Sequence, residues 1–400
     1  MSAVGYISYK EKVRAEVLRS FNRLKEKFDI VVIEGAGSPA EINLKSHDIV
    51  NMSMALAADA PVILIGDIDK GGVFAHLVGT LELLTKREKE QVKGFIINKF
   101  RGDKRLLGSG IRFLEKRTGI RVLGVVPYFR DIRLPEEDSV ALDELRVTSH
   151  ELRVTKSIDI AVIKLPHISN FTDFDALEDE PDVRLRYVDM ADAMGNPDVI
   201  IIPGTKNTIV DLQWLKRSGI ADRILSAIRY PLSAILIGIC GGYQMLGETI
   251  RDAHGMESKQ KEIEGLGLLP IVTTLERDKT LAQVTAKEAE TGLEVSGYEI
   301  HHGRTINMKS NRHVFKAAGT GRQDGASSDD GKVWGTYIHG VFDRDAFRRD
   351  FLNRVRVKKD LPPIRRHASC SLDKELDKLA KLLRDNIDMK LLYKTMNYEL

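Results

Sequence analysis

Short apolar runs alternate with amphipathic stretches along the first part of the chain. Ile49–Ala58 and Gly72–Leu84 are examples of the helix-like stretches. The apolar runs between them are "FDIVVIEG", "APVILIGDID", "VKGFIINKF" and "RVLGVVPYF". Apolar strands that alternate with helices are typical of a parallel sheet covered by helices. The pattern therefore predicts an α/β domain in this part of the chain.

A second α/β series follows a charged segment of weak periodicity. Its runs are "IDIAVIKLP", "VRLRYVDM", "PDVIIIPGT" and "SAILIGIC". After Gly265 the pattern becomes richer in strands, and the last residues, "SLDKELDKLAKLLRDNIDMKLLYKTMNYEL", are typical of amphipathic helices. We therefore predict an α/β domain at 1–130, a linker at 131–157, a second α/β domain at 158–355 and a helical tail at 356–400.

Composition and charge narrow the class of protein. Hydrophobic and charged residues make up 42% and 30% of the chain, as in a globular enzyme. The 61 basic and 58 acidic residues leave a net charge of +3, so neither nucleic acid nor a membrane is expected as a partner. No apolar run approaches the roughly 20 residues of a membrane-spanning helix, and the N-terminus has no signal-peptide core. Cys240 and Cys370 lack metal-type spacing and favour a reducing compartment, so we expect a cytoplasmic protein.

The run "ILIGICGGYQMLG" ends on Cys240, which two glycines and a helical pattern follow. "GICGG" satisfies the pattern of a nucleophile elbow with cysteine in place of serine. The glycines allow the sharp strand-to-helix turn that holds a side chain away from the fold. The alternative is a buried cysteine at a strand end, which is common for so apolar a side chain.

A cysteine nucleophile needs a base, and "WGTYIHGVF" offers His339 after a predicted strand. "IIIPGTKNT" places Gly204 and Thr205 at the end of another strand, where their N–H groups and that of Gly241 can form an oxyanion hole. Taken alone, the histidine is more often structural, and the second motif is equally compatible with a plain strand-to-loop turn.

Polar side chains also follow the strands predicted in the first domain. Glu34 comes directly after "VVI", and Glu41 follows in the same segment. Asp67 and Asn98 stand at the ends of the next two strands. Carboxylates at strand ends beside glycines are typical of Mg²⁺ and nucleotide sites, which makes Glu34 the candidate metal ligand. Solvated loop carboxylates are the alternative.

The stretch "GYEIHHGRT" carries four polar side chains near one strand end, and its role is left open. A place near the active cleft and a packed strand with polar edges are equally compatible with it. A metal site is disfavoured because no third ligand has suitable spacing. The four residues are Tyr298, Glu299, His301 and His302.

The second half resembles a class I glutamine amidotransferase domain, which implies that Cys240 attacks the glutamine amide and releases ammonia. Many such domains carry a glutamate two residues after the histidine, and this chain has Val341 there. This departure is similar to the branch fused to cobyrinate-type synthetases, and it implies a Cys–His dyad without a third carboxylate.

Seven motifs together resemble the cobyric acid synthase family. They are "EGAGSPAEINL", "DIDKGGVFA", "NKFRGD", "PGTKNT", "GICGGYQMLG", "GYEIHHGRT" and "YIHGVF". The resemblance implies a P-loop NTPase domain similar to dethiobiotin synthetase at 1–130 and the glutaminase at 158–355. It also implies Mg-ATP, L-glutamine as ammonia donor and a corrinoid substrate, adenosylcobyrinic acid a,c-diamide, whose b, d, e and g carboxylates become amides.

One departure concerns the start of the first domain. The family begins with a strand and a P-loop, and no G-x-x-x-x-G-K-[ST] occurs in this chain. The P-loop domain is therefore expected to be N-terminally truncated, with an incomplete Mg-ATP site and either a complementary N-terminal fragment or a second copy as partner. Three alternatives are a cobyrinic acid a,c-diamide synthase, a glutaminase fragment and a non-catalytic partner.

Overall fold

The computed structural model describes residues 3–129, 132, 158–229, 234–258, 260–308, 312–364, 372–396 and 398. The chain forms two compact units, and the first combines Met1–Leu134 with Leu372–Leu400. The second unit is Pro135–Ser371. Almost all of the predicted linker, 131–157, lies outside the described residues, as does Cys370. No helix in the described parts is long and apolar enough to cross a membrane.

The first unit contains a parallel sheet of order β1-β2-β3, as predicted from three of the apolar runs. Its strands are β1 (Val62–Asp67), β2 (Val92–Phe100) and β3 (Arg121–Pro127). Leu77, Phe95 and Leu114 belong to the buried core between sheet and helices. The helices are α1 (Ala3–Lys25), η1 (Lys45–His47), α2 (Met52–Ala58), α3 (Val73–Leu83), α4 (Lys86–Gln91) and α5 (Lys104–Thr118).

The strand predicted at "FDIVVIEG" is absent. Residues 28–36 form no strand, and Val32 is 88% exposed. An extended segment is stable as a strand only when a neighbour satisfies its backbone hydrogen bonds. In the part of the chain that the structure describes, β1 ends the sheet and pairs only with β2, so this apolar run has no strand beside it.

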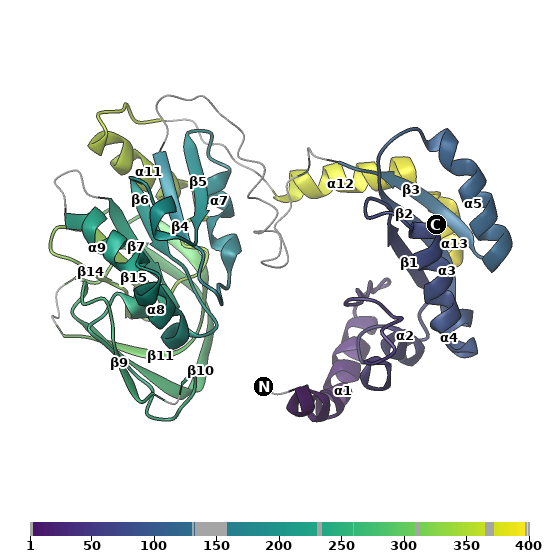
Figure 1. The fold of residues 1–400 in the computed structure, drawn as a ribbon, viewed down its shortest axis with the longest axis horizontal. Helices are drawn as coiled ribbons and strands as arrows, with labels where there is room; N and C mark the ends of the chain where they lie inside the picture. Colours follow the sequence, from purple (N-terminus) through teal and green to yellow (C-terminus); the bar gives the residue numbers. More distant parts are fainter. Residues whose placement is uncertain are drawn as a thin grey trace. The chain divides into compact units, whose positions relative to one another are not determined.

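The two C-terminal helices belong to the first unit. They are α12 (Leu372–Asn386) and α13 (Met389–Thr395), which Figure 1 shows in yellow beside β3. At their junction, the backbone N–H of Asp388 donates to Leu123 O at 2.8 Å. Gly124 pairs with Ile387, and a Cβ on Gly124 would lie 2.4 Å from Asn386 O. The end of the predicted helical tail, 356–400, thus packs directly on a buried strand.

The second unit is built around a sheet of order β14-β15-β7-β6-β4-β5 (Figure 1), in which all strands except β14 run parallel. The central strands β4, β6 and β7 are almost wholly buried, which explains their continuous apolar sequences. The strands are β4 (Ile158–Ile163), β5 (Val183–Val188), β6 (Val199–Ile202), β7 (Ile235–Ile239), β14 (Ala326–Ser327) and β15 (Val333–Thr336).

Short and long helices connect these strands. Those that carry or support the candidate site are η3, α7, α10 and α11. The bounds are η3 (Phe171–Phe174), α7 (Asp175–Glu178), η4 (Ala191–Ala193), α8 (Thr208–Arg217), α9 (Ile220–Arg229), α10 (Gly241–Met245) and α11 (Asp345–Lys358).

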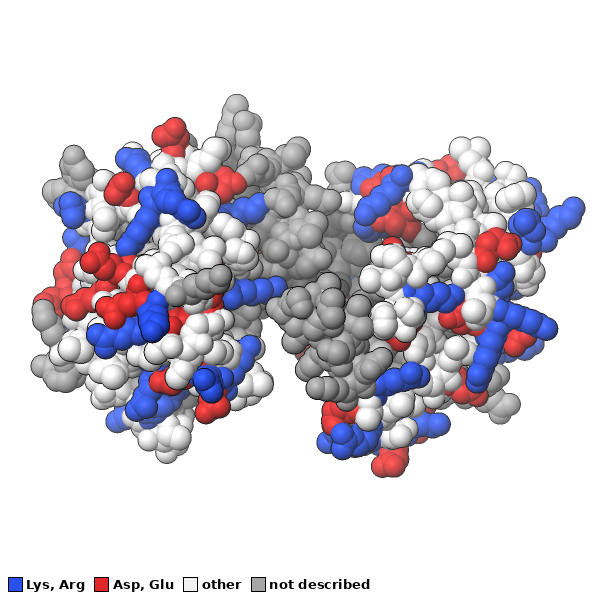
Figure 2. Space-filling model, turned by 60° about the horizontal axis from the view of Figure 1, so that its bottom comes forward, with Lys and Arg blue, Asp and Glu red and all other residues white. Residues whose placement is uncertain are grey.

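Most strands of a second sheet follow Gly265, where the sequence predicts more strand. Its order is β13-β12-β10-β8-β9, and the long strands β10 and β11 form an antiparallel pair. The bounds are β8 (Thr249–Arg251), β9 (Glu262–Glu264), β10 (Ile271–Glu288), β11 (Glu294–Asn307), β12 (Phe315–Ala317) and β13 (Gln323–Asp324). On the face in Figure 2, basic and acidic side chains are intermixed over both units.

Candidate active site

Cys240 stands at the sharp turn between β7 and α10, as the elbow pattern predicts. Its backbone has φ of 52° and ψ of −105°, a conformation that non-glycine residues rarely adopt. The turn packs tightly, because a Cβ on Gly242 would lie only 1.9 Å from Ile202 O at the end of β6. The fold therefore stabilises a strained backbone at this cysteine, which is characteristic of functional residues.

His339 follows β15 and is 1% exposed. Two backbone hydrogen bonds with Tyr298 fix its position: His339 N–H donates to Tyr298 O at 2.9 Å, and Tyr298 N–H donates to His339 O at 3.2 Å. The ring lies close to the Cys240 side chain, whose Sγ donates to Ile300 O at 3.7 Å. The structure thus brings together the two residues predicted as nucleophile and base.

The expectation of a Cys–His dyad without a third carboxylate is wrong. Nδ1 of His339 donates to Oδ2 of Asp173 at 2.7 Å, and Gly340 N–H donates to the other oxygen at 3.0 Å. Asp173 lies in η3 and is 3% exposed. Val341 is fully buried in the core and occupies a position that needs no polar group. The carboxylate comes from a different part of the sheet instead of the histidine's own loop.

This environment changes the protonation of His339. Burial alone lowers the pKa of the imidazole, but the bond to Asp173 and the nearby Cys240 side chain favour the imidazolium and raise the pKa from 6.5 to about 10. With Nδ1 engaged by Asp173, the second ring nitrogen is left to exchange a proton with the thiol. Cys240, His339 and Asp173 therefore have the geometry of a nucleophile, a base and an orienting acid.

Tyr298 covers one face of the histidine ring. The two ring centroids lie 5.2 Å apart with an interplanar angle of 23°, and the tyrosine hydroxyl accepts a hydrogen bond from Asn170 Nδ2 at 3.0 Å. Burial raises the pKa of this hydroxyl, and the nearby carboxylates of Asp173 and Asp343 raise it further. The stacked, neutral ring restricts the orientation of His339 from the side of β11.

The three residues predicted as oxyanion donors lie beside this site. A Cβ on Gly241 would be 2.7 Å from Thr205 Cγ2 and 3.3 Å from Thr205 N, so the elbow and the end of β6 are in contact. A Cβ on Gly204 would be 2.9 Å from Cε1 of His339. Gly204 thus touches the ring of the base, while Thr205 and Gly241 touch each other.

The remaining polar residues of β11 form a packed group. Glu299, 1% exposed, is paired with Arg322 and lies 3.7 Å from Nε2 of His301. Burial raises the pKa of Glu299, but the neighbouring His301 and the bond to Arg322 outweigh it and lower the pKa. Nδ1 of His302 bonds with Glu276 O at 3.2 Å. Among the described residues no group of three or more His, Cys, Asp or Glu could hold a metal.

In the first unit, two of the four predicted nucleotide-site residues lie together. Asp67 and Asn98 are register neighbours at the carboxyl ends of β1 and β2. Asp67 is paired with Lys99 at 3.1 Å, and this ion pair raises the pKa of Lys99. Within the described residues, the exposed Glu34 and Glu41 form no hydrogen bond or ion pair with either residue.

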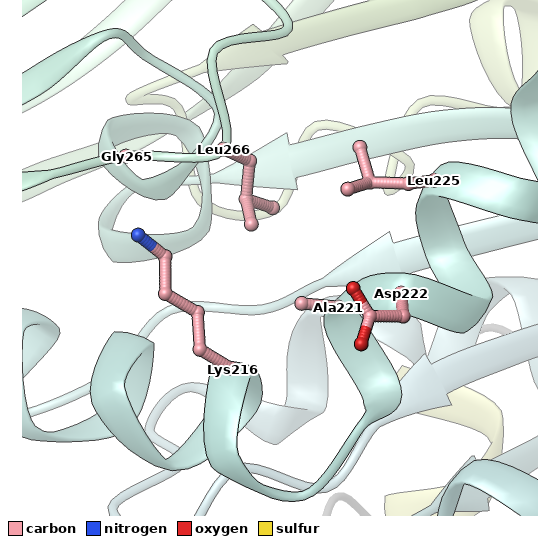
Figure 3. Close-up of a pocket in the computed structure, with 6 residues that line it drawn as sticks. All are labelled: Lys216, Ala221, Asp222, Leu225, Gly265 and Leu266. Atoms are coloured by element: carbon pink, nitrogen blue, oxygen red, sulfur yellow. The ribbon is translucent and has the colours of Figure 1, made fainter.

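A separate cavity of about 320 Å³ lies against the turn between α8 and α9 (Figure 3). Lys216 lines this cavity, and its Nζ donates to Glu264 O at 2.6 Å. None of the predicted site residues lines this cavity, so it is distinct from the candidate active site. Its lining residues are Lys216, Ala221, Asp222, Leu225, Gly265 and Leu266.

Comparison with known proteins covers both units. Residues 159–347 match the CobB/CobQ-like glutamine amidotransferase domain, and residues 5–136 match an AAA domain. The chain is 48% identical over 410 residues to the cobyric acid synthase of Dehalococcoides mccartyi strain CBDB1, and the alignment covers 99% of this chain and 80% of that protein.

Two further relatives are similar to this chain over almost its whole length. The chain is 47% identical over 410 residues to the cobyric acid synthase of Salmonella typhimurium, with 99% of this chain and 79% of that protein covered. It is 44% identical over 402 residues to the adenosylcobalamin biosynthesis bifunctional protein CobDQ of Leptospira interrogans, with 99% and 46% covered. With its glutamine amidotransferase domain, the chain belongs to the cobyric acid synthase family.

Proposed function

We propose that the second unit hydrolyses glutamine to glutamate and ammonia by means of Cys240, His339 and Asp173. The observation that carries the proposal is the imidazole close to the elbow cysteine and bonded to a buried carboxylate, with Nδ1 2.7 Å from Asp173 Oδ2. The similarity of 159–347 to glutamine amidotransferases supports glutamine as the substrate.

The reaction is an acyl transfer in two stages. With the thiol proton already on His339, as its raised pKa favours, the sulfur of Cys240 attacks the side-chain amide carbon of glutamine, and N–H groups of Gly241 and Thr205 or Gly204 donate to the developing oxyanion. His339 then gives its proton to the amide nitrogen, so that ammonia leaves and a thioester remains. Water, deprotonated by His339, adds to the thioester, and glutamate is released as the thiol regains its proton.

The ammonia serves a second reaction, for which we propose amidation of the b, d, e and g carboxylates of adenosylcobyrinic acid a,c-diamide. A carboxylate does not react with ammonia unaided, so this step requires ATP, in keeping with the similarity of residues 5–136 to an AAA domain. Asp67 and Asn98, at the carboxyl edge of the sheet, are the proposed nucleotide contacts. We also propose a cytoplasmic location, because a free catalytic thiol requires reducing conditions.

The test separates the two reactions. In Cys240→Ser, glutamine-dependent ammonia release should fall to background. Corrinoid amidation driven by ammonium chloride and ATP should equal that of the native chain assayed under the same conditions. Undiminished glutaminase activity would disprove the role of the cysteine. Offering cobyrinic acid in place of the a,c-diamide distinguishes the sister diamide synthase.

A further inference from the structure

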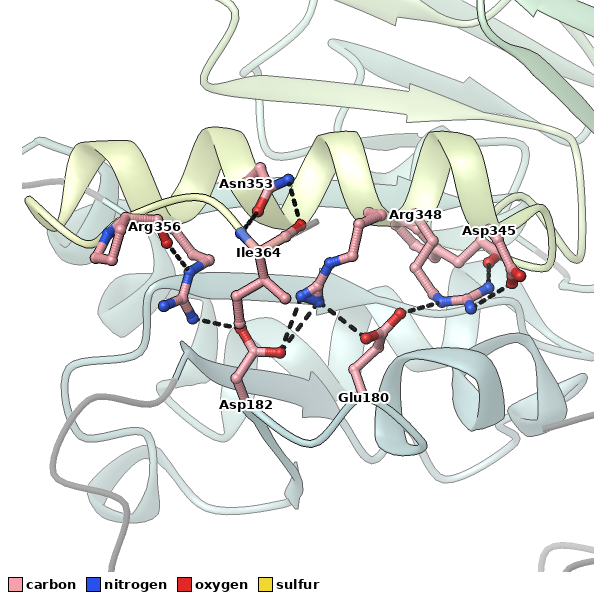
Figure 4. Close-up of polar contacts among 10 residues, drawn as sticks. Glu180, Asp182, Asp345, Arg348, Asn353, Arg356 and Ile364 are labelled. Carbon is pink, nitrogen blue, oxygen red and sulfur yellow. Dashed lines mark hydrogen bonds and ion pairs between the residues drawn. The ribbon is translucent and has the colours of Figure 1, made fainter. Parts of the chain in front are cut away.

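A buried ion-pair network joins α11 to the turn between α7 and β5 (Figure 4). Glu180 is 2% exposed and accepts hydrogen bonds from two arginines, Arg348 Nε and Arg349 Nη1, both at 2.9 Å. Asp182 accepts from Arg349 Nη2 at 3.0 Å and is also paired with Arg356. All five side chains of this network are nearly excluded from water, so the geometry of each ion pair is restricted.

Arg348 differs from the other two arginines in what else it binds. Its Nη1 donates to the backbone oxygens of Phe342 at 2.9 Å and Asp343 at 3.1 Å. Its Nη2 donates to Asp345 Oδ1 at 2.5 Å. The carbonyls of Phe342 and Asp343 lie in the loop that begins with His339. One guanidinium therefore holds the loop of the proposed base at several points, which the planar donor set of arginine allows and a lysine ammonium does not.

The acidic partner, Glu180, lies on the segment that carries the proposed orienting acid. Asp173 belongs to η3, which continues into α7, and Glu180 N–H donates to Leu177 O at the end of α7. The pair of Arg348 and Glu180 thus links the same two segments as the bond of His339 with Asp173. Both contacts hold the loop of His339 to the segment that carries Asp173. If one of these segments moves when the pair of Arg348 and Glu180 is altered, the distance between the imidazole and the carboxylate changes as well.

We propose that Arg348, through Glu180, is a positioning residue that sets the geometry of His339 and Asp173 for glutamine hydrolysis. The inference rests on the proposed function, in which His339 is the base. Arg356 provides an internal comparison, because it is buried in the same network and pairs with Asp182, but its other bond is to Pro362 O at 2.7 Å, beyond the far end of α11.

The test compares Arg348→Lys with Arg356→Lys in the full chain. Glutaminase kcat and KM are measured against pH and normalised to the folded fraction from circular dichroism. Arg348→Lys should lower kcat at least about tenfold with KM changed less than about twofold, because ground-state binding of glutamine is preserved. The pKa in its kcat profile should fall, because the imidazolium loses contact with Asp173. Arg356→Lys should keep kcat within about twofold and the native pH profile.

A second matched pair covers the case in which Arg348→Lys does not fold. Glu180→Gln removes the charge that Arg348 binds, whereas Asp182→Asn removes the neighbouring charge that it does not bind. Only Glu180→Gln should lower kcat and shift the pH profile. Equal losses in both members of either pair, or an unchanged pH profile in the Arg348 and Glu180 variants, would overturn the positioning role. Glutaminase activity surviving in Cys240→Ser would instead contradict the proposed function.

Discussion

At the scale of single residues, Asp173 determines which ring nitrogen of His339 faces the thiol. Its carboxylate holds the proton on Nδ1 and leaves the other nitrogen for the thiol. We expect Asp173→Asn to lower glutaminase kcat on the order of 10²- to 10⁴-fold, as in other triads that lose this acid, with little change in KM. Ammonia release measures the effect. Asp343→Asn is the control, because this nearby carboxylate has no bond to His339; equal losses in the two variants would contradict the assignment.

The same contact predicts a pH dependence of stability. The pKa of His339 is about 10 in the folded protein and has its ordinary value of 6.5 in the unfolded chain. Because the folded value is raised, its contribution is fully present below about pH 6.5 and is lost as the pH rises toward 10. The melting temperature of the native chain should therefore exceed that of Asp173→Asn by more at about pH 6 than at about pH 9. Thermal unfolding at the two pH values checks this, and a gap that widens with pH would refute it.

The sequence predicted only part of this site. Cys240 and His339 carry local signals, namely flanking glycines and a strand end. Asp173 lies 166 positions before His339, in a segment, "NFTDFDALEDE", where several acidic residues look alike. Only the fold selects one of them, since the contact depends on how η3 approaches the end of β15. The Val341 position was therefore misleading: the absence of a carboxylate beside the histidine says nothing about a carboxylate from another element.

At the scale of elements, the strand-turn-helix unit at Cys240 tolerates no side chain where it crosses β6. Alanine at Gly242 would place its Cβ 1.9 Å from Ile202 O, a backbone atom that cannot rotate away. We expect Gly242→Ala to destabilise the second unit by more than about 2 kcal/mol. Gly79→Ala is the matched control: Gly79 lies inside α3 with open space around it, so the change should stabilise by about 0.5–1 kcal/mol. Denaturant titration gives both values, and a harmless Gly242→Ala would disprove the tight crossing.

The strand predictions are confirmed for segments that have a neighbouring strand. Apolar runs such as Val199–Ile202 and Ile235–Ile239 are buried on both sides between hydrogen-bonded partners. The run at residues 28–35 also has an apolar centre, but it has no partner strand in the described chain, and it is not a strand. Periodicity and β-propensity describe a segment, whereas strand formation depends on what lies beside it.

At the scale of the whole molecule, the first unit is completed by the C-terminal end of the chain. Asp388 N–H bonds to Leu123 O at 2.8 Å, and α12 and α13 both pack against β3. Cys240, His339 and Asp173, in contrast, all belong to the second unit. The stability of the first unit and the glutaminase reaction should therefore respond separately to changes at the C-terminus.

Deleting residues 372–400 should expose the apolar side of β3 and lower the unfolding temperature of the first unit, while glutaminase kcat and KM stay within about twofold of the native values. Gly124→Val tests the same contact in the full chain, because a Cβ there would lie 2.4 Å from Asn386 O, so it should reproduce the selective loss. Limited proteolysis and calorimetry report which unit opens first, and ammonia release reports the second unit. An unchanged first transition in both variants would show that the C-terminal helices do not stabilise this sheet. Loss of glutaminase activity on deletion would show that the two units do not respond separately.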